Sequence, residues 1–158
     1  MQVQGFIKTQ DPRELLGLLE ALYSYQIREC QYPHALVPNG SQLWLDSFLP
    51  TLGLYSNIFV LTSKTEALLG FIALRVKTYP KYLNVHPRGQ IGEMFVVPEV
   101  RQQGGGQLLV SEAQKWFRQK NIRVLELNTV VGNGLGEKFW EKMGFSLELK
   151  QWSKILLP

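Results

Sequence analysis

The segment Val96–Gln107, with the sequence VVPEVRQQGGGQ, combines residue types that can bind an anionic group. Three adjacent glycines stand between an apolar, strand-like run and a stretch with helical spacing. A turn that leaves a strand and opens a helix exposes backbone N–H groups without helical partners, and the helix dipole adds partial positive charge there. Arg101 supplies a fixed charge at the start of this turn. The pattern favours a phosphate site, although a plain tight turn has the same composition.

Two common phosphate motifs do not fit the segment. The sequence contains no Gly-Lys-Ser/Thr, which excludes a Walker A loop, and Leu109 stands where a dinucleotide fingerprint requires its third glycine. A metal site is not expected either, because His34 and His86 lie far apart in the sequence and Cys30 is the single cysteine.

Two motifs carry a resemblance to a known family. The pattern V-x-P-x-x-R-x-x-G-x-G begins at Val96 and resembles the acyl-CoA signature of the GNAT superfamily of N-acetyltransferases. The segment 133–145, NGLGEKFWEKMGF, resembles the second motif of that superfamily. The resemblance implies acetyl-CoA as co-substrate, with its pyrophosphate on the glycine turn and its pantetheine along the backbone of a splayed strand. The residues expected to contact it are Phe95, Val96, Val97, Arg101, Gln102, Gln103, Gly104, Gly105, Gly106, Gln107, Asn133 and Phe139.

Glu93 is the best candidate for a catalytic base. It lies just upstream of the splayed strand segment, on the same face as Phe95 and Val97, and acetyl transfer to an amine needs a group that takes the proton. The alternative is that Glu93 only pairs with a surface arginine or positions a cationic acceptor without taking its proton. The resemblance implies that a main-chain N–H near Val96 stabilises the oxyanion.

Trp140 is the second candidate catalytic residue, and it departs from the family pattern. Many relatives carry at this position a tyrosine that protonates the sulfur of CoA, whereas an indole N–H can donate a hydrogen bond but no proton. Trp140 therefore either hydrogen-bonds the sulfur or packs in the core. Two readings are also open for Asn133, which either binds pantetheine or caps the helix that follows.

The resulting hypothesis is an N-acetyltransferase that moves an acetyl group directly to a primary amine of a small molecule or protein within a ternary complex. A catalytically silent acyl-CoA-binding or regulatory module is the alternative, because the usual tyrosine is missing at Trp140. The acceptor itself is not identified. In this architecture its pocket is expected near the following residues: Tyr23, Tyr25, Glu29, His34, Tyr79, Tyr82 and His86.

Length and composition set the remaining expectations. The 158 residues predict one domain spanning 1–158, and a hydrophobic fraction of 45% without a long apolar run argues against a membrane protein. The N-terminus shows no secretory signal, so a cytoplasmic location is expected. The net charge of +4 is dispersed, so no nucleic-acid partner is expected. The hydrophobic end WSKILLP leaves a homodimer open.

The periodicity predicts an α/β chain with the element order βααβββαβαββ. A mixed, mostly antiparallel sheet of about seven strands is expected, flanked by helices, with a splayed parallel pair at its centre. The last two strands are assigned to FSLELKQWSKILL, and this order is also the one that GNAT proteins show. In such sheets ligands bind beyond the carboxyl ends of the strands, where the glycine turn lies.

Overall fold

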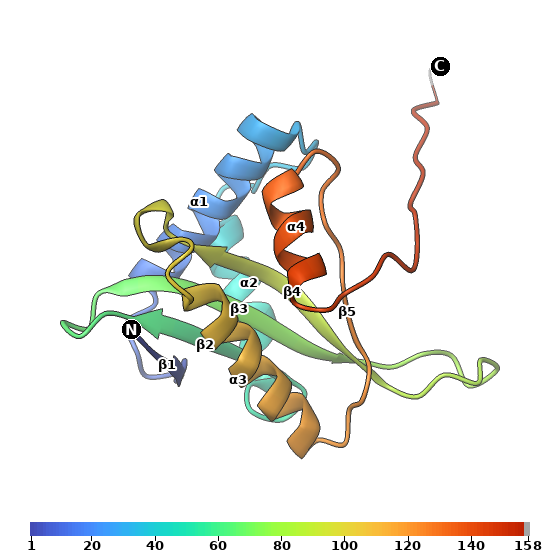
Figure 1. Cartoon of the computed structure of the whole chain (residues 1–158), viewed down its shortest axis with the longest axis horizontal. Coiled ribbons are helices and arrows are strands. Elements are labelled where there is room, and N and C mark those ends of the chain that lie inside the picture. The colour runs from blue at the N-terminus through green and yellow to red at the C-terminus, as the bar shows by residue number, and fades with distance from the viewer. Residues whose placement is uncertain (157–158) are drawn as a thin grey trace.

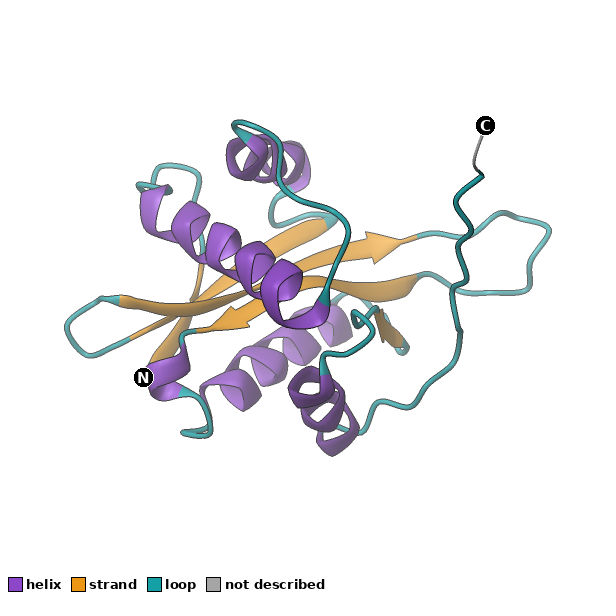
Figure 2. Ribbon diagram, turned by 90° about the horizontal axis from the view of Figure 1, so that it is seen from above, coloured by secondary structure: helices purple, strands orange, loops and turns teal. Residues whose placement is uncertain are grey.

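The computed structural model describes residues 1–156 and contains a five-stranded sheet with helices on both faces (Figures 1 and 2). The sheet order is β1-β2-β3-β4-β5, and every neighbouring pair is antiparallel except β4 and β5, which are parallel. The strands are β1 Gln2–Gly5, β2 Ser56–Thr62, β3 Leu68–Lys77, β4 Arg88–Val96 and β5 Leu125–Leu127. The helices are α1 Arg13–Cys30, α2 Gly40–Phe48, α3 Gly105–Gln119 and α4 Gly134–Lys142, with short 3-10 turns η1 Leu49–Thr51 and η2 Pro98–Val100.

Each face of the sheet is covered by two helices. α1 and α2 pack on one face, where a buried cluster joins them to β2, β3 and Phe95 of β4. α3 packs on the opposite face against Leu61, Ile72 and Ile91, and α4 adds partly buried aromatic residues to the same cluster. The sheet is thus the middle layer of three, and residues of β4 contribute to both clusters.

Helical periodicity explains why α1 and α3 form where they do. In α1 the buried residues Leu15, Leu19 and Leu22 recur every three or four positions, which puts them on one face of the helix. Asp11 accepts a hydrogen bond from the backbone N–H of Arg13 at 3.0 Å and so satisfies one free donor of the first turn. Among residues 1–156, no helix is both long and apolar enough to cross a membrane.

The strand β4 contains a bulge. Ile72 lies opposite Met94, and Leu74 lies opposite Ile91. Two residues of β4, Gly92 and Glu93, therefore lie opposite a single residue of β3, Ala73. A bulge bends the strand and redirects its side chains. Ile91 and Met94 consequently both pack on the α3 face, although they are three residues apart.

The number of strands differs from the sequence-based expectation of about seven. Within the described residues the segment after Phe145 forms no strand, so the two predicted terminal strands are absent and the sheet has five. The predicted parallel pair does form, but as β4 and β5 at one edge of the sheet instead of at its centre. Alternation shows that a segment can be a strand, but a strand also needs a neighbouring edge.

Two glycines in β4 give a matched test of the packing that holds β5. A Cβ on Gly89 would lie 2.6 Å from Leu125 and 2.7 Å from Phe117, whereas a Cβ on Gly92 would meet its nearest neighbour, the carbonyl oxygen of Ala73, at 3.8 Å. We predict that Gly89→Ala lowers the free energy of unfolding by about 1–3 kcal/mol through overpacking. Gly92→Ala should change it by less than about 0.5 kcal/mol. Urea unfolding measures both, and equal losses would contradict this account of the β4–β5 contact.

Candidate active site

The carboxyl-terminal half of β4 has a free edge. Within residues 1–156, β5 pairs with β4 only at Gly89, Gln90 and Ile91, so the backbone after Ile91 has no strand partner there on that side. The N–H of Val97 donates to the carbonyl of Leu69 on β3 at 2.9 Å. Since alternate residues of a strand direct their backbone groups to opposite edges, the N–H and C=O of Val96 face the free edge, where the C=O already accepts a hydrogen bond from Arg101. An extended amide-bearing ligand can pair with such an edge.

The glycine turn follows at the end of this strand. Gly104 has φ +85° and is the N-cap of α3, without a side-chain cap hydrogen bond. The first helical hydrogen bond runs from the N–H of Leu108 to the carbonyl of Gly104 at 3.1 Å. The preceding N–H groups of the first turn therefore have no helical acceptor, which is the arrangement that binds phosphate.

The three glycines of the turn serve different purposes. Gly104 supplies the left-handed backbone, and a Cβ there would have open space. A Cβ on Gly105 would lie 2.6 Å from Leu61, and one on Gly106 would lie 3.1 Å from both Met94 and Phe139. Gly105 thus lets α3 approach the sheet, and Gly106 lets it approach α4.

Arg101 points back toward the sheet in this structure. Its Nε donates to the carbonyl oxygen of Val96 at 2.9 Å, and its guanidinium carbon lies 5.4 Å from the ring centroids of both Tyr25 and Phe95. Tyr25 also donates its hydroxyl to Oδ1 of Asn133 at 3.5 Å. Arg101 therefore ties the turn to β4, while Tyr25 brings α1 beside the start of α4.

The second motif forms α4 and its cap. Oδ1 of Asn133 accepts a hydrogen bond from the N–H of Gly136 at 3.1 Å, so Asn133 caps the helix in this structure. Phe139 and Trp140 have ring centroids 4.9 Å apart, and Trp140 lies 5.3 Å from the ring of Phe145. Edge contacts of this kind are typical of aromatic packing. They support the packing role of Trp140, and its donation to the CoA sulfur stays a prediction.

Glu93 lies partly buried on the α2 face of the sheet. Burial raises the pKa of its carboxyl, while the indole of Trp44 and the charge of Arg75 oppose part of that shift. The Trp44 N–H is close to the carboxylate but outside hydrogen-bonding geometry, and this buried donor has no partner among the described residues. A carboxylate with a raised pKa is a better proton acceptor near neutral pH.

Of the residues around Glu93, Trp44 and Arg75 were not identified from the sequence, whereas Tyr23 was among the expected acceptor residues. Arg75 donates to Oγ of Ser47 at 2.6 Å, and its guanidinium carbon lies 3.6 Å from the ring centroid of Phe48. Tyr23 is close enough for the charge of Glu93 to contribute to its raised pKa, for which burial is the main cause. No local signal marks Trp44 or Arg75, because α2 and β3 bring them to Glu93 from distant positions.

The structure separates the other candidate acceptor residues. The ring of Tyr23 is 6.4 Å from that of Tyr32, which is 5.1 Å from His34, so these aromatic side chains form a chain leading from the Glu93 region. The residues of the β3–β4 loop lie elsewhere, because the pair Lys77 and Arg88 closes that hairpin at the other end of β4. In that loop Tyr79 donates to Glu126, and Tyr82 and His86 are exposed. Glu29 forms an exposed ion pair with Arg28.

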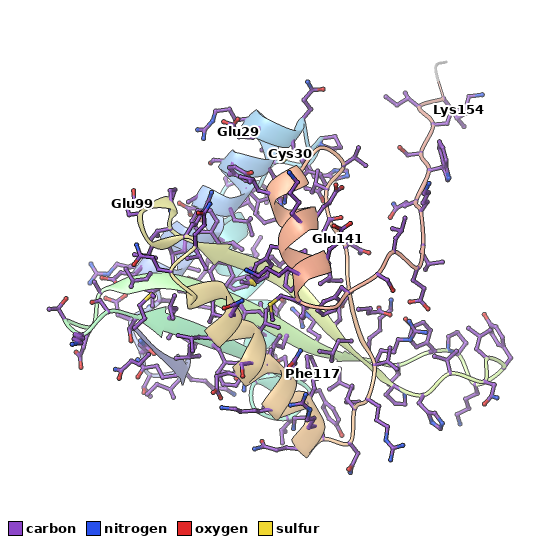
Figure 3. The ribbon with its side chains drawn as sticks, viewed as in Figure 1. Glu29, Cys30, Glu99, Phe117, Glu141 and Lys154 are labelled. Carbon is purple, nitrogen blue, oxygen red and sulfur yellow. The ribbon has the colours of Figure 1, made fainter. Side chains whose placement is uncertain are left out.

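Cys30 lies closer to the second motif than its sequence position indicates. It ends α1, beside the start of α4 (Figure 3), and its backbone is 3.9 Å from a Cβ placed on Gly132. Burial raises the pKa of its thiol, and the charge of Glu29 adds to that shift. A buried thiol with a raised pKa is a poor nucleophile at neutral pH.

Comparison with known proteins identifies the family. The chain matches the acetyltransferase (GNAT) family over residues 19–145. It therefore belongs to the GNAT acetyltransferases, and it is an N-acetyltransferase that uses acetyl-CoA as co-substrate. The resemblance seen in the two motifs is thus confirmed. A sequence comparison with curated proteins finds no match.

Solved structures of low sequence identity share the fold. A variant of the BH1408 protein from Bacillus halodurans is 16% identical, with a TM-score of 0.81 over 99% of this chain and 100% of that chain. The aminoglycoside N-acetyltransferase AAC(6')-Iy, bound to a bisubstrate analog, is 18% identical, with a TM-score of 0.76 over 98% of both chains. AAC(6')-Ih from Acinetobacter baumannii is 15% identical, with a TM-score of 0.76 over 99% of both chains.

The opposite environments of two glutamates lead to a prediction about pH. The pKa of Glu93 is raised in the folded protein, so the folded state loses stability as the pH rises from the ordinary range of glutamate through that raised value. Glu93→Gln stays neutral and avoids this loss. Its melting temperature should therefore exceed that of the wild type at neutral pH, and the difference should close as the pH falls.

Glu126 is the control, because its pKa is shifted in the opposite direction. Burial alone would raise its pKa, but hydrogen bonds from Lys77, at 2.6 Å, and from Tyr79 outweigh that effect and lower it. The stability that it contributes is present above the ordinary glutamate pKa and is lost as the pH falls. Glu126→Gln should accordingly melt below the wild type at neutral pH. Calorimetric melting of the wild type and the two variants across pH measures both differences in melting temperature. A Glu93→Gln variant that melts below the wild type at neutral pH would contradict the raised pKa of Glu93.

Proposed function

We propose that this acetyltransferase moves the acetyl group of acetyl-CoA to a primary amine of a small molecule or peptide, by direct transfer within a ternary complex. The observation that carries the proposal is the convergence on β4 of three features: the free edge at Val96, the partly buried Glu93 and the glycine turn that opens α3. Each of the three meets a separate requirement of the reaction.

The glycine turn and the free edge have the chemistry to hold the acetyl donor. Unpaired N–H groups at the start of α3 suit the pyrophosphate, and Gly104 allows close approach. The backbone of β4 beyond Ile91 suits the amides of pantetheine. In this arrangement the N–H of Val96 is the donor proposed for the oxyanion of the tetrahedral intermediate.

Glu93 is proposed as the base. The attacking amine must lose a proton as the new C–N bond forms, and Glu93 accepts that proton directly or through one water. The carbonyl carbon then expels the thiolate of CoA. With a thiol pKa of about 8.5, the thiolate is a tolerable leaving group without a strong acid, so the position held by Trp140 does not prevent turnover.

The acceptor amine is proposed to enter from the side of α1 and α2. The aromatic side chains of Tyr23 and Trp44 lie near Glu93, and a carboxylate among aromatic rings attracts a cationic or polar amine. Because AAC(6')-Iy and AAC(6')-Ih are aminoglycoside acetyltransferases, aminoglycosides belong in the first panel of acceptors, beside polyamines and peptide amines. Release of free CoA thiol identifies an acceptor, and no release with any amine would count against the proposal.

Direct transfer is favoured over a covalent intermediate. Cys30 is the single thiol of the chain, and its raised pKa keeps it protonated and unreactive at neutral pH. The chain therefore has no cysteine suited to form an acetyl-enzyme intermediate before the acetyl group reaches the amine.

Kinetics of Glu93→Gln test the base. The substitution keeps the shape of the side chain but removes its basicity, so kcat should fall by on the order of a hundredfold or more while CoA affinity barely changes. The residual rate should rise with pH as more amine becomes neutral. The matched control is Glu99→Gln, since Glu99 is exposed at the start of the turn (Figure 3). If Glu93→Gln raises only the KM of the amine, Glu93 attracts the acceptor and is not the base.

A second prediction concerns the glycine turn. Gly104 and Gly53 have nearly the same backbone, with φ of +85° and +84°, and a Cβ on either residue meets nothing within 4 Å. Alanine in this conformation costs about 1–2 kcal/mol at either position. Gly104→Ala should weaken CoA binding about tenfold, because the strained turn shifts its N–H groups. Gly53→Ala should lose similar stability but bind CoA normally. Calorimetric titration with CoA measures both affinities. Equal affinities would show that the glycine turn does not bind CoA.

A further inference from the structure

The indole N–H of Trp44 is a buried donor that has no hydrogen-bond partner among the described residues. The rest of this side chain, on α2, is only partly buried. Folded proteins pair nearly all of their buried donors, because an unpaired one loses its bonds to water without replacement. A buried donor that stays unpaired beside a candidate active site therefore calls for a role in that site.

Neighbouring side chains hold the ring of Trp44 in place. Its centroid lies 5.0 Å from that of Phe48 and 5.7 Å from that of Phe71, and both of these phenylalanines are buried. Oγ of Ser47 donates to the carbonyl oxygen of Trp44 at 2.6 Å and accepts a hydrogen bond from Arg75 at 2.6 Å. This bond pair ties α2 to β3 at the same point. The indole N–H therefore has little freedom to turn toward a different acceptor.

The carboxylate of Glu93 is an acceptor close to this N–H. The indole of Trp44 opposes the rise that burial causes in the pKa of Glu93, and such an effect requires the two groups to be near each other. The ring of Trp44 is packed, whereas the Glu93 side chain has several rotatable bonds. A rotation of Glu93 can therefore complete the hydrogen bond without disturbing the aromatic cluster.

Two other ionisable side chains lie near Glu93, and neither takes the place of Trp44. The guanidinium of Arg75 on β3 donates to the carbonyl oxygen and to Oγ of Ser47, at 3.2 and 2.6 Å, so its donors are directed away from the carboxylate. Burial lowers the pKa of Arg75, and the charge of Glu93 opposes that shift. Burial raises the pKa of Tyr23 on α1, and the charge of Glu93 adds to that shift without a hydrogen bond between the two.

We propose that Trp44 is a positioning residue for Glu93: its indole N–H binds one carboxylate oxygen and leaves the other oxygen free to take the proton of the acceptor amine. As the new C–N bond forms, the N–H bond of the amine breaks, its electron pair stays on nitrogen, and the proton moves to the free oxygen of Glu93. A donor on the carboxylate also favours the ionised form, which is the form that accepts a proton. This inference rests on the proposed role of Glu93 as the base.

Nuclear magnetic resonance of the indole groups tests the contact without any acceptor. The chain has four tryptophans, and the signal of Trp44 is identified by its loss in Trp44→Phe. In the wild type this N–H signal should shift as Glu93 titrates, and in Glu93→Gln it should stay constant over the same pH range. Trp116, which packs in the cluster on the opposite face of the sheet, is the internal control. A Trp44 signal that does not respond to pH, or that responds equally in Glu93→Gln, would overturn the proposal.

The pH dependence of turnover tests the positioning role. Trp44→Phe keeps an aromatic ring beside Phe48 and Phe71 but removes the N–H, so the pKa of Glu93 should rise further. The acid limb of kcat at saturating amine should then move to higher pH by about one pH unit. Below this limb kcat should fall about tenfold relative to the wild type, and above it kcat should nearly recover. Trp116→Phe makes the same change in the other cluster and should keep the wild-type profile.

The outcomes separate this inference from the proposed function. If Trp44→Phe lowers kcat equally at every pH, or leaves the acid limb where it is, Trp44 acts through packing alone and the inference is overturned. If Glu93→Gln keeps full kcat, the assignment of Glu93 as the base fails, and with it the positioning role. In that case the Trp44 signal would still follow the titration of Glu93, which shows that the contact exists without a part in the reaction. Circular dichroism confirms that each variant folds.

Discussion

The short parallel contact between β4 and β5 is the constraint on which the candidate site depends. Gly89 allows Phe117 and Leu125 to pack directly on β4, and this packing holds the two strands together for three residues. Beyond Ile91 the contact ends, and the bulge at Gly92 and Glu93 changes the direction of the strand. If β5 followed β4 to its end, the backbone edge at Val96 would be paired and unavailable to a ligand. The separation of the two strands therefore creates the candidate site.

One strand and the turn that follows it consequently carry the groups proposed for the reaction. The bulge directs Glu93 to the face covered by α1 and α2, while Met94 packs on the face covered by α3. Val96 presents its N–H at the free edge, and the same chain continues into the turn that opens α3. Because these groups are close in sequence, their relative positions depend on a single rigid strand, and Arg101 reinforces it by bonding back to Val96. Rigid support of this kind preorganises a site.

Glu93 and Glu126 show how the environment shifts the pKa of two glutamates in opposite directions. Both are glutamates on neighbouring strands, but Glu126 is paired with Lys77 and Tyr79, and its pKa is lowered. Among the described residues Glu93 forms no ion pair, since Arg75 is engaged by Ser47 and Phe48, and burial raises the pKa of Glu93. A buried carboxylate that the surroundings do not neutralise lowers stability, and residues of this kind concentrate at functional sites.

The sequence by itself determined the local features of this protein. The glycine run, the stripe of apolar residues in α1 and the cap at Asn133 depend on neighbours within a few positions, so their residue types predicted a turn, a helix and a helix start. Two motifs in order were enough to predict the family and its acetyl donor. Alternation likewise identified residues 145–150 as able to form a strand.

Only the tertiary structure decided which distant groups meet. Trp44 and Arg75 lie near Glu93 because α2 and β3 bring them to the same face, and nothing local in the sequence marks them. Cys30 lies beside Gly132 for the same reason. The terminal strands were predicted and did not form within the described residues, because alternation specifies the two faces of a strand and leaves its partner open. Strand pairing depends on the neighbouring strands of the assembled sheet, so it cannot be predicted from one segment alone.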